Sequence, residues 1–424
     1  MMKKICLLIF LLCPFLLNGE IFLLKIDGPI ETITEEYVVD SFKEVKSALG
    51  AKLVIIQIDT PGGFDTSMRG IIKEILASPV PVAVYVSPRG ARAGSAGFFI
   101  TIAADIAAMA PGTNMGAAHP VSITGTQIEE TMRKKVTNDA VSYAKSLANT
   151  RNRNEDLSGK AVEESRSYTA EECLKNTLVE YIAQDVENLL QQLEGKEIRM
   201  INGKTFTLKL KNEKIITLEL SARQKFLKTI SNPTLALVLL VFGLIALLIE
   251  FTHAGAIIPG VLGGISLLLA FLAFHILPIN YVGLFLIILS IGFFIAEIKI
   301  QGFGAFGVGG IVSFVLGSMM LVNSPIPEMR PAMSMIIMLA ILFGAVFMFL
   351  TYKVIQAMKL KTATGVEGMT GEIGEARTEI TPSSGKVFVH AEWWNAVADE
   401  TIPEGSKVVV ESIHNFVMKV KRVS

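Results

Sequence analysis

Five apolar segments in the second half of the chain constrain its fold most strongly. Each approaches the roughly 20 residues that an α-helix needs to span about 30 Å of hydrocarbon. They cover 233–251, 255–276, 280–296, 304–322 and 332–352. Hydrophobic residues make up 51% of the 424 residues and charged residues only 18%, as expected of a chain with a membrane-embedded part. We therefore predict a helical membrane region of about five spans over residues 231–353.

The first residues have the layout of a secretory signal peptide. In MMKKICLLIFLLCPFLLNGE, a short basic start precedes an apolar run and small polar residues. This pattern predicts a signal peptide over residues 1–19 and export of the residues that follow. Cys6 and Cys13 lie in this segment, which leaves Cys173 alone in the rest of the chain, so no disulfide framework is expected.

Residues 20–230 alternate short β-rich runs with helix-like stretches. The runs include IFLLKI, KLVIIQID, PVAVYV and IAAMA. Uninterrupted apolar strands need cover on both faces, so the pattern predicts an α/β domain with a mainly parallel sheet. Residues 201–220 alternate apolar and polar positions around a turn, and we expect them to form a β-hairpin that closes this domain.

Residues 354–424 resume a soluble character. Short alternating strands separated by glycine-containing turns, as in GKVFVHAEWWNAVA, predict a small all-β, five-stranded barrel of the OB type. OB barrels often bind nucleic acid through aromatic side chains. Here Trp393 and Trp394 stand beside Glu392, and the 39 basic and 39 acidic residues of the chain cancel. We therefore expect no nucleic-acid partner and interpret the tryptophans as barrel core plus a protein contact.

The signal peptide and the lysines predict the orientation in the membrane. If residues 20–230 are exported, five spans return the C-terminus to the cytoplasm. The lysines directly after the last segment agree with the positive-inside tendency: Lys353, Lys359 and Lys361. Basic residues before the first segment argue the other way, but an exported domain translocates largely regardless of such charges. We expect a multi-pass protein of the cell (inner) membrane, with residues 20–230 extracytoplasmic and residues 354–424 cytoplasmic.

Two glycines follow a predicted buried strand in IQIDTPGGFDTS, residues 56–67. Because Gly62 and Gly63 lack a Cβ, their backbone N–H groups can point into a site without obstruction. Such donors can form an oxyanion hole.

Ser95 stands in Ala-Gly-Ser-Ala-Gly, between the strand PVAVYV and an apolar helix-like run. Its hydroxyl would lie at the positive end of that helix, with the Ala96 N–H nearby as a further oxyanion donor. That position suits a nucleophile. Taken alone, the alternative interpretation is that Ser95 only caps the helix in a tight turn.

The combination of these two motifs resembles the ClpP-class serine proteases of the ClpP/crotonase fold. The whole order of segments resembles the long form of the NfeD family, also called stomatin operon partner proteins, and the resemblance spans nearly all of the chain. Its most specific pieces are DTPGG (59–63), ARAGSAGFFI (91–100), MAPGTNMGAAHPV (109–121), KVTNDAVSYAKSLA (135–148) and GKVFVHAEWWNA (385–396). It implies a ClpP/crotonase-type exported domain and a homo-oligomer, at least a dimer.

Ser95 needs a base, because a serine hydroxyl is a weak nucleophile at its own pKa. The resemblance implies a lysine at the start of the Lys-x-Thr-Asn helix, which is Lys135, and a desolvated lysine can lose its charge and accept a proton. His119, the only histidine before the membrane region, is the alternative base, since imidazole titrates in the right range. Lys134 and Lys145 are further candidates, although both are more simply interpreted as solvated helix charges.

Residues 121–134 separate the site from Lys135 and contain Gly125 among polar residues. We expect this loop to bring Lys135 into place only when a substrate or partner orders it, which would guard against stray proteolysis.

These features together predict a membrane-bound, ATP-independent serine endopeptidase with a Ser95–Lys135 dyad. The resemblance implies that it cleaves hydrophobic segments of membrane-associated proteins and has a stomatin-like or flotillin-like partner. The sequence has no Walker motif and no His or Cys spacing typical of a metal site, so no cofactor is expected. One alternative is a non-enzymatic membrane scaffold that binds such partners through the OB domain. Another is a crotonase-like acyl-CoA enzyme, which export disfavours because CoA is cytosolic.

Overall fold

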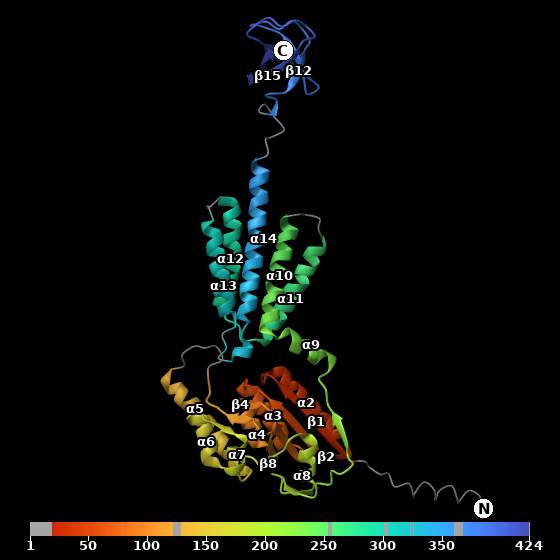
Figure 1. The fold of residues 1–424 in the computed structure, drawn as a ribbon, viewed down its shortest axis with the longest axis vertical. Helices are drawn as coiled ribbons and strands as arrows, with labels where there is room; N and C mark the ends of the chain where they lie inside the picture. The colour runs from red at the N-terminus through yellow and green to blue at the C-terminus, as the bar shows by residue number, and fades with distance from the viewer. Residues whose placement is uncertain are drawn as a thin grey trace, which may run out of the picture. The chain divides into compact units, whose positions relative to one another are not determined.

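The computed structural model describes residues 19–121, 129–252, 257–300, 304–322, 324, 326–359 and 368–423 (Figure 1). The predicted signal peptide, apart from Gly19, and residues 122–128 of the predicted loop 121–134 lie outside these ranges. The chain divides into two compact units: Met1–Ile295 with Gly304–Phe343, and Ala296–Phe303 with Gly344–Ser424.

A six-stranded parallel sheet forms the centre of the N-terminal domain. Its strand order is β11-β1-β2-β3-β5-β8, and every neighbouring pair is parallel. The strands are β1 (Glu20–Asp27), β2 (Ala51–Asp59), β3 (Val82–Val86), β5 (Ile106–Met109), β8 (Tyr181–Ile182) and β11 (Lys214–Thr217). This pairing confirms the predicted parallel α/β architecture.

Both faces of this sheet are buried, which explains the uninterrupted apolar strands. Successive strand residues point to opposite faces. Ile56 and Val84 face a core shared with α2 (Thr32–Ser47), α3 (Asp65–Leu76) and α4 (Ala96–Ala103). Ile55 and Tyr85 face a second core that includes residues of α8 (Val186–Leu193). The covered sheet therefore forms a rigid base for the loops at its strand ends.

Further helices and a small sheet complete the domain. Figure 1 shows α5, α6 and α7 gathered on one side of the large sheet. Their bounds are α5 (Glu130–Thr150), α6 (Glu155–Glu163) and α7 (Ala170–Lys175). The last helix of the domain is α9 (Ala222–Ile230). A three-stranded sheet of order β4-β6-β7 consists of β4 (Arg92–Gly94), β6 (Asn114–Gly116) and β7 (Ser167–Thr169).

The predicted hairpin over residues 201–220 is wrong in its pairing. β10 (Thr205–Thr207) pairs antiparallel with the preceding β9 (Glu197–Arg199), around a turn in which Gly203 has a φ of +79°. β11 instead joins the edge of the large sheet, where it pairs in parallel with β1. The alternating pattern located the strands correctly, but a local pattern does not specify the partner strand.

In the part of the predicted membrane region that the structure describes, five apolar helices follow one another: α10 (Pro233–Thr252), α11 (Ile257–Ile276), α12 (Tyr281–Ile300), α13 (Ala305–Leu321) and α14 (Met333–Lys359). Among the described residues, three stretches are long and apolar enough to cross a membrane: Pro233–Phe251, Ile257–Ile276 and Pro327–Phe349. Two shorter apolar stretches, Tyr281–Glu297 and Ala305–Leu321, correspond to the third and fourth predicted segments.

The C-terminal residues form a closed barrel of five strands, as predicted, in the order β12-β13-β14-β16-β15. The strands are β12 (Ile373–Ala376), β13 (Lys386–Val389), β14 (Glu392–Val397), β15 (Lys407–His414) and β16 (Val417–Arg422). Trp394 packs against the barrel core. Trp393 is 61% exposed, because the two neighbours point to opposite faces of β14. One tryptophan therefore packs on the core, and the protein contact expected of the pair stays a prediction.

Candidate active site

Ser95 lies between β4 and α4, directly before the first helical residue. Its side chain makes no capping hydrogen bond, so helix capping does not explain the serine. Its backbone N–H donates to the Gly116 carbonyl at 2.9 Å, and its φ of +49° is unfavourable for a residue with a Cβ. Backbone strain of this kind is common at functional sites.

Gly62 lies against Ser95. A Cβ at Gly62 would stand 2.6 Å from the Ser95 Cβ and 3.2 Å from the Ser95 Oγ. The φ of Gly62 is +117°, a conformation that side chains with a Cβ rarely adopt. The structure therefore brings together the two motifs that the sequence separates by about 30 residues, as the proposed oxyanion hole requires.

The loop that carries Gly62 is held by backbone hydrogen bonds on both sides. Thr60 donates its N–H to the Arg92 carbonyl at 2.8 Å and accepts from the Gly94 N–H at 3.0 Å. On the other side, the Ile30 N–H donates to the Gly62 carbonyl at 2.8 Å. These bonds fix the glycine loop to the strand that leads into Ser95.

The three expected oxyanion donors differ in their hydrogen bonding. The Gly62 N–H donates to Thr60 Oγ1 at 3.1 Å. In the described part of the chain, no residue accepts a hydrogen bond from the N–H of Gly63 or Ala96. Ala96 is the first residue of α4, where backbone N–H groups have no partner within the helix. Gly63 and Ala96 are therefore the available donors, and Thr60 is a residue of the site that the sequence did not single out.

Lys135 lies near the start of α5 and is exposed to solvent. No hydrogen bond or ion pair joins its amine to Ser95 or to any other described residue. Its neighbour Lys134 pairs with Glu130 at 2.8 Å on the exposed helix surface. The structure therefore does not bring Lys135 and Ser95 together.

An ionic contact ties α5 to α3. Arg69 of α3 pairs with Asp65 at 2.9 Å and with Asp139 of α5 at 2.7 Å. The Arg69 guanidinium also lies 4.3 Å from the ring centre of Tyr143. Asp139 follows Lys135 by four positions, so both lie on one face of α5. This contact therefore holds the helix face that carries Lys135.

His119 makes a structural contact. Its Nδ1 lies 3.0 Å from the Val162 carbonyl, so this nitrogen carries the proton and donates. The Ala118 N–H also donates to the Ala161 carbonyl at 2.8 Å, which fixes the Ala-Ala-His-Pro turn to α6. Lys145 lies beside α6 as well, since a Cβ at Gly159 would stand 2.6 Å from the Lys145 Cε.

Glu31 is a titratable residue near the site that sequence reasoning missed. It directly precedes α2 and follows Ile30, which pairs with the glycine loop. Burial raises the pKa of its carboxyl to about 7, against the opposing effect of the positive charge of Lys228. A carboxylate before a helix N-terminus is ordinarily favourable, so the sequence carried no signal of this shift.

Three family models match the chain in succession. The NfeD1b N-terminal domain matches residues 20–202, the NfeD integral membrane domain residues 234–353, and the NfeD-like C-terminal, partner-binding domain residues 366–422. The membrane-bound protease PH1510 of Pyrococcus horikoshii is 34% identical over 427 residues, which cover 98% of this chain and 96% of the relative. The chain belongs to the NfeD family of membrane-bound serine proteases. The membrane protein NfeD1b of Bacillus subtilis, another NfeD protein, is 25% identical over 423 residues, 92% of this chain and 89% of that protein.

Solved structures of a membrane-bound protease also match. A membrane protease, 1510-N, specific for a stomatin homologue from Pyrococcus horikoshii, is 31% identical, with a TM-score of 0.44 over 50% of this chain and 98% of that chain. A lysine-to-alanine mutant of 1510-N in complex with a substrate peptide is 32% identical, with a TM-score of 0.46 and the same coverage.

Proposed function

We propose that the N-terminal domain of this NfeD protein is an ATP-independent endopeptidase of the ClpP/crotonase fold, with Ser95 as nucleophile and Lys135 as general base. The observation that carries the proposal is the contact between Gly62 and Ser95. It holds a glycine loop with an available N–H group against a serine in a strained backbone conformation.

In the proposed reaction, Ser95 Oγ attacks the carbonyl carbon of the scissile peptide bond and gives its proton to the neutral amine of Lys135. The N–H groups of Gly63 and Ala96 stabilise the negative charge on the carbonyl oxygen. Lys135 then protonates the leaving amine, and water hydrolyses the acyl-enzyme to regenerate Ser95. The hydrogen bond from the Gly62 N–H to Thr60 Oγ1 holds the glycine loop in position.

Lys135 must approach Ser95 for this chemistry. We propose that binding of a substrate or partner seats Lys135 beside the serine. Support comes from the exposed position of Lys135, whose amine has no hydrogen-bond or ion-pair partner among the described residues.

By extension from its relatives, we propose hydrophobic segments of stomatin-like membrane-associated proteins as substrates. We also propose a stomatin-like or flotillin-like partner, since the barrel matches a partner-binding domain. The protease domain is proposed to be extracytoplasmic in the cell (inner) membrane, the barrel cytoplasmic, and the protein at least a dimer.

Cleavage of a panel of hydrophobic peptides by the full-length protein in detergent tests the catalytic proposal. Ser95→Ala and Lys135→Ala should each lower kcat at least about 1,000-fold, while His119→Ala should retain most of the activity. Lys134→Ala is the matched control, since it removes the neighbouring exposed ammonium. Activity lost in His119→Ala but kept in Lys135→Ala would identify histidine as the base. Folded wild-type protein that cleaves no peptide would favour the scaffold alternative.

A further inference from the structure

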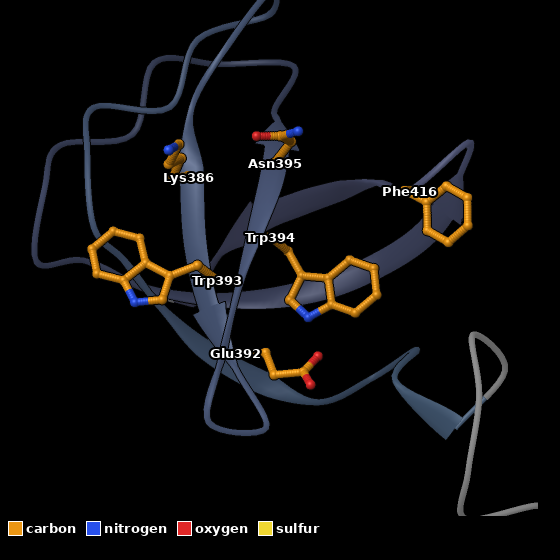
Figure 2. Close-up of a pocket in the computed structure, with 6 residues that line it drawn as sticks. All are labelled: Lys386, Glu392, Trp393, Trp394, Asn395 and Phe416. Carbon is orange, nitrogen blue, oxygen red and sulfur yellow. The ribbon is translucent and has the colours of Figure 1, made fainter.

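A pocket on the C-terminal barrel has no role in the proposed proteolysis. Figure 2 shows the six residues that line it. We call it the β14 pocket; its lining residues are Lys386, Glu392, Trp393, Trp394, Asn395 and Phe416. All of them belong to the barrel, so the pocket does not depend on Ser95 or on the placement of the other parts of the chain.

The barrel displays Phe416 to solvent in an unfavourable conformation. This residue lies in the turn between β15 and β16, has a φ of +63°, and is 77% exposed. A bulky side chain at such a φ is strained, and an exposed ring gains nothing from burial in the fold. The positive φ belongs to the two-residue hairpin turn, in which Asn415 also has a φ of +47°. The ring itself is left exposed and is available to a partner.

Trp394 has a donor without an acceptor. Its indole N–H is buried, and no described residue accepts a hydrogen bond from it. In Figure 2, the Trp394 and Phe416 rings lie on the same side of β14, and Trp393 points the other way. A buried donor without a partner is unfavourable. A ligand that brings a carbonyl oxygen to this nitrogen would relieve that cost.

One half of β14 has a paired strand on only one side. β13 pairs with β14 from Glu392 to Asn395. In the described part of the barrel, β16 pairs with β14 only from Asn395 to Val397. The segment Glu392–Trp394 therefore offers an edge to which an extended peptide can add by backbone hydrogen bonds.

The charges of the pocket favour a peptide over a polyanion. Lys386 and Glu392 carry opposite charges and both line the pocket. The Glu392 carboxylate would repel the phosphates of a nucleic acid. It would not repel an extended apolar peptide, which has no net charge.

We propose that the β14 pocket binds an extended apolar segment of a partner protein. The segment adds to Glu392–Trp394 as a strand, one of its backbone carbonyls accepts from the Trp394 N–H, and an apolar side chain packs on Phe416. The matching family model describes a partner-binding domain, and the proposal gives that binding a position and a chemistry.

Intrinsic fluorescence tests the proposal on the full-length protein in detergent. Trp393 and Trp394 are the only two tryptophans of the chain, so its emission reports this pocket without a label. The probe is a capped ten-residue peptide of alternating Val and Thr. We expect a saturable blue shift, and a Kd about tenfold higher for the same peptide N-methylated at alternate residues, which cannot pair as a strand.

Two matched substitutions locate the binding. Phe416→Ala should raise the Kd of the Val-Thr peptide about tenfold. Ile373→Ala removes a side chain of β12 that is 61% exposed and does not line the pocket, and it should leave the Kd unchanged.

Trp394→Phe separates a binding role from a structural one. It keeps an aromatic ring and removes the unpaired N–H, so the barrel should melt at the same or a higher temperature while the peptide binds more weakly. Lower stability with unchanged binding would contradict the proposal.

Three further outcomes overturn it: no shift with the Val-Thr peptide, a shift with a ten-nucleotide oligothymidine alone, and a shift on concentrating the protein without peptide. The last would place a second copy of this chain in the pocket. Ser95→Ala should bind the peptide like the wild type, so a failed protease proposal is distinguishable from a failed pocket.

Discussion

Gly62 packs so closely against Ser95 that a Cβ on Gly62 would not fit. A Cβ at Gly62 would stand 2.6 Å from the Ser95 Cβ, and the φ of +117° is itself strained for any other residue. We therefore expect Gly62→Ala to lower kcat/KM for peptide cleavage by about 100-fold or more, the order of loss produced by a 1 Å misplacement at an active site.

The control for this substitution is Gly195→Ala. Gly195 also has a positive φ, +73°, but nothing lies within 4 Å of an added Cβ. It should lose about 1 kcal/mol of unfolding free energy from strain and keep its activity. Equal losses of activity in both variants would show that backbone strain, and not the contact with Ser95, matters at Gly62.

Thr60 should affect catalysis through the glycine loop. Its Oγ1 accepts the Gly62 N–H at 3.1 Å, and the side chain is fully buried. Thr60→Val leaves that N–H without a partner, at a cost of about 1–3 kcal/mol of unfolding free energy, and loosens the loop beside Ser95. We expect kcat to fall while Thr60→Ser restores it. A Thr60→Val variant with raised kcat would mean that the freed Gly62 N–H is itself an oxyanion donor.

The contact between Arg69 and Asp139 should matter more for activity than for stability. Both ion pairs of Arg69 are solvent-exposed, so their loss should change the unfolding free energy by about 1 kcal/mol or less. Because Asp139 shares a helix face with Lys135, Asp139→Asn should nonetheless lower kcat. Glu130→Gln, which breaks only the Lys134 pair, is the control. Unchanged kinetics in Asp139→Asn would argue that α5 takes its active position without this contact.

Glu31 should make the stability of the N-terminal domain depend on pH. Its folded-state pKa, about 7, lies above the ordinary value of 4.5, so folding favours the protonated carboxyl. The stabilising contribution is complete below pH 4.5 and is lost as the pH rises through about 7. Glu31→Gln should therefore be more stable than wild type at pH 8, by on the order of 1–3 kcal/mol, and similar at pH 4. Thermal melts followed by circular dichroism check this, and a difference that is the same at both pH values would contradict it.

The hydrophobic periodicity of the sequence predicted the architecture well, because strands that are buried on both faces are apolar along their whole length. The parallel sheet and the closed barrel follow from apolar runs and alternating strands. The partner of β11 did not, because its pairing with β1 joins residues almost 200 positions apart. The structure places Gly62 against Ser95, and the roles of the two residues in catalysis stay predictions. The separation of Ser95 and Lys135 along the sequence does not determine their distance in the folded chain. In the structure, Lys135 is exposed.

The pairing of β11 with β1 has a consequence for the order in which the domain assembles. Along the sheet, each strand from β1 to β8 is added beside one made before it, so these strands can pair as the chain emerges. β11 alone returns to the first strand made, and the Tyr37 hydroxyl then donates to the Leu218 carbonyl at 2.7 Å. Until Thr217 has emerged, one side of β1 remains an open edge, the kind of surface on which chains aggregate. The nascent domain is therefore most in need of protection just before its last strand is made.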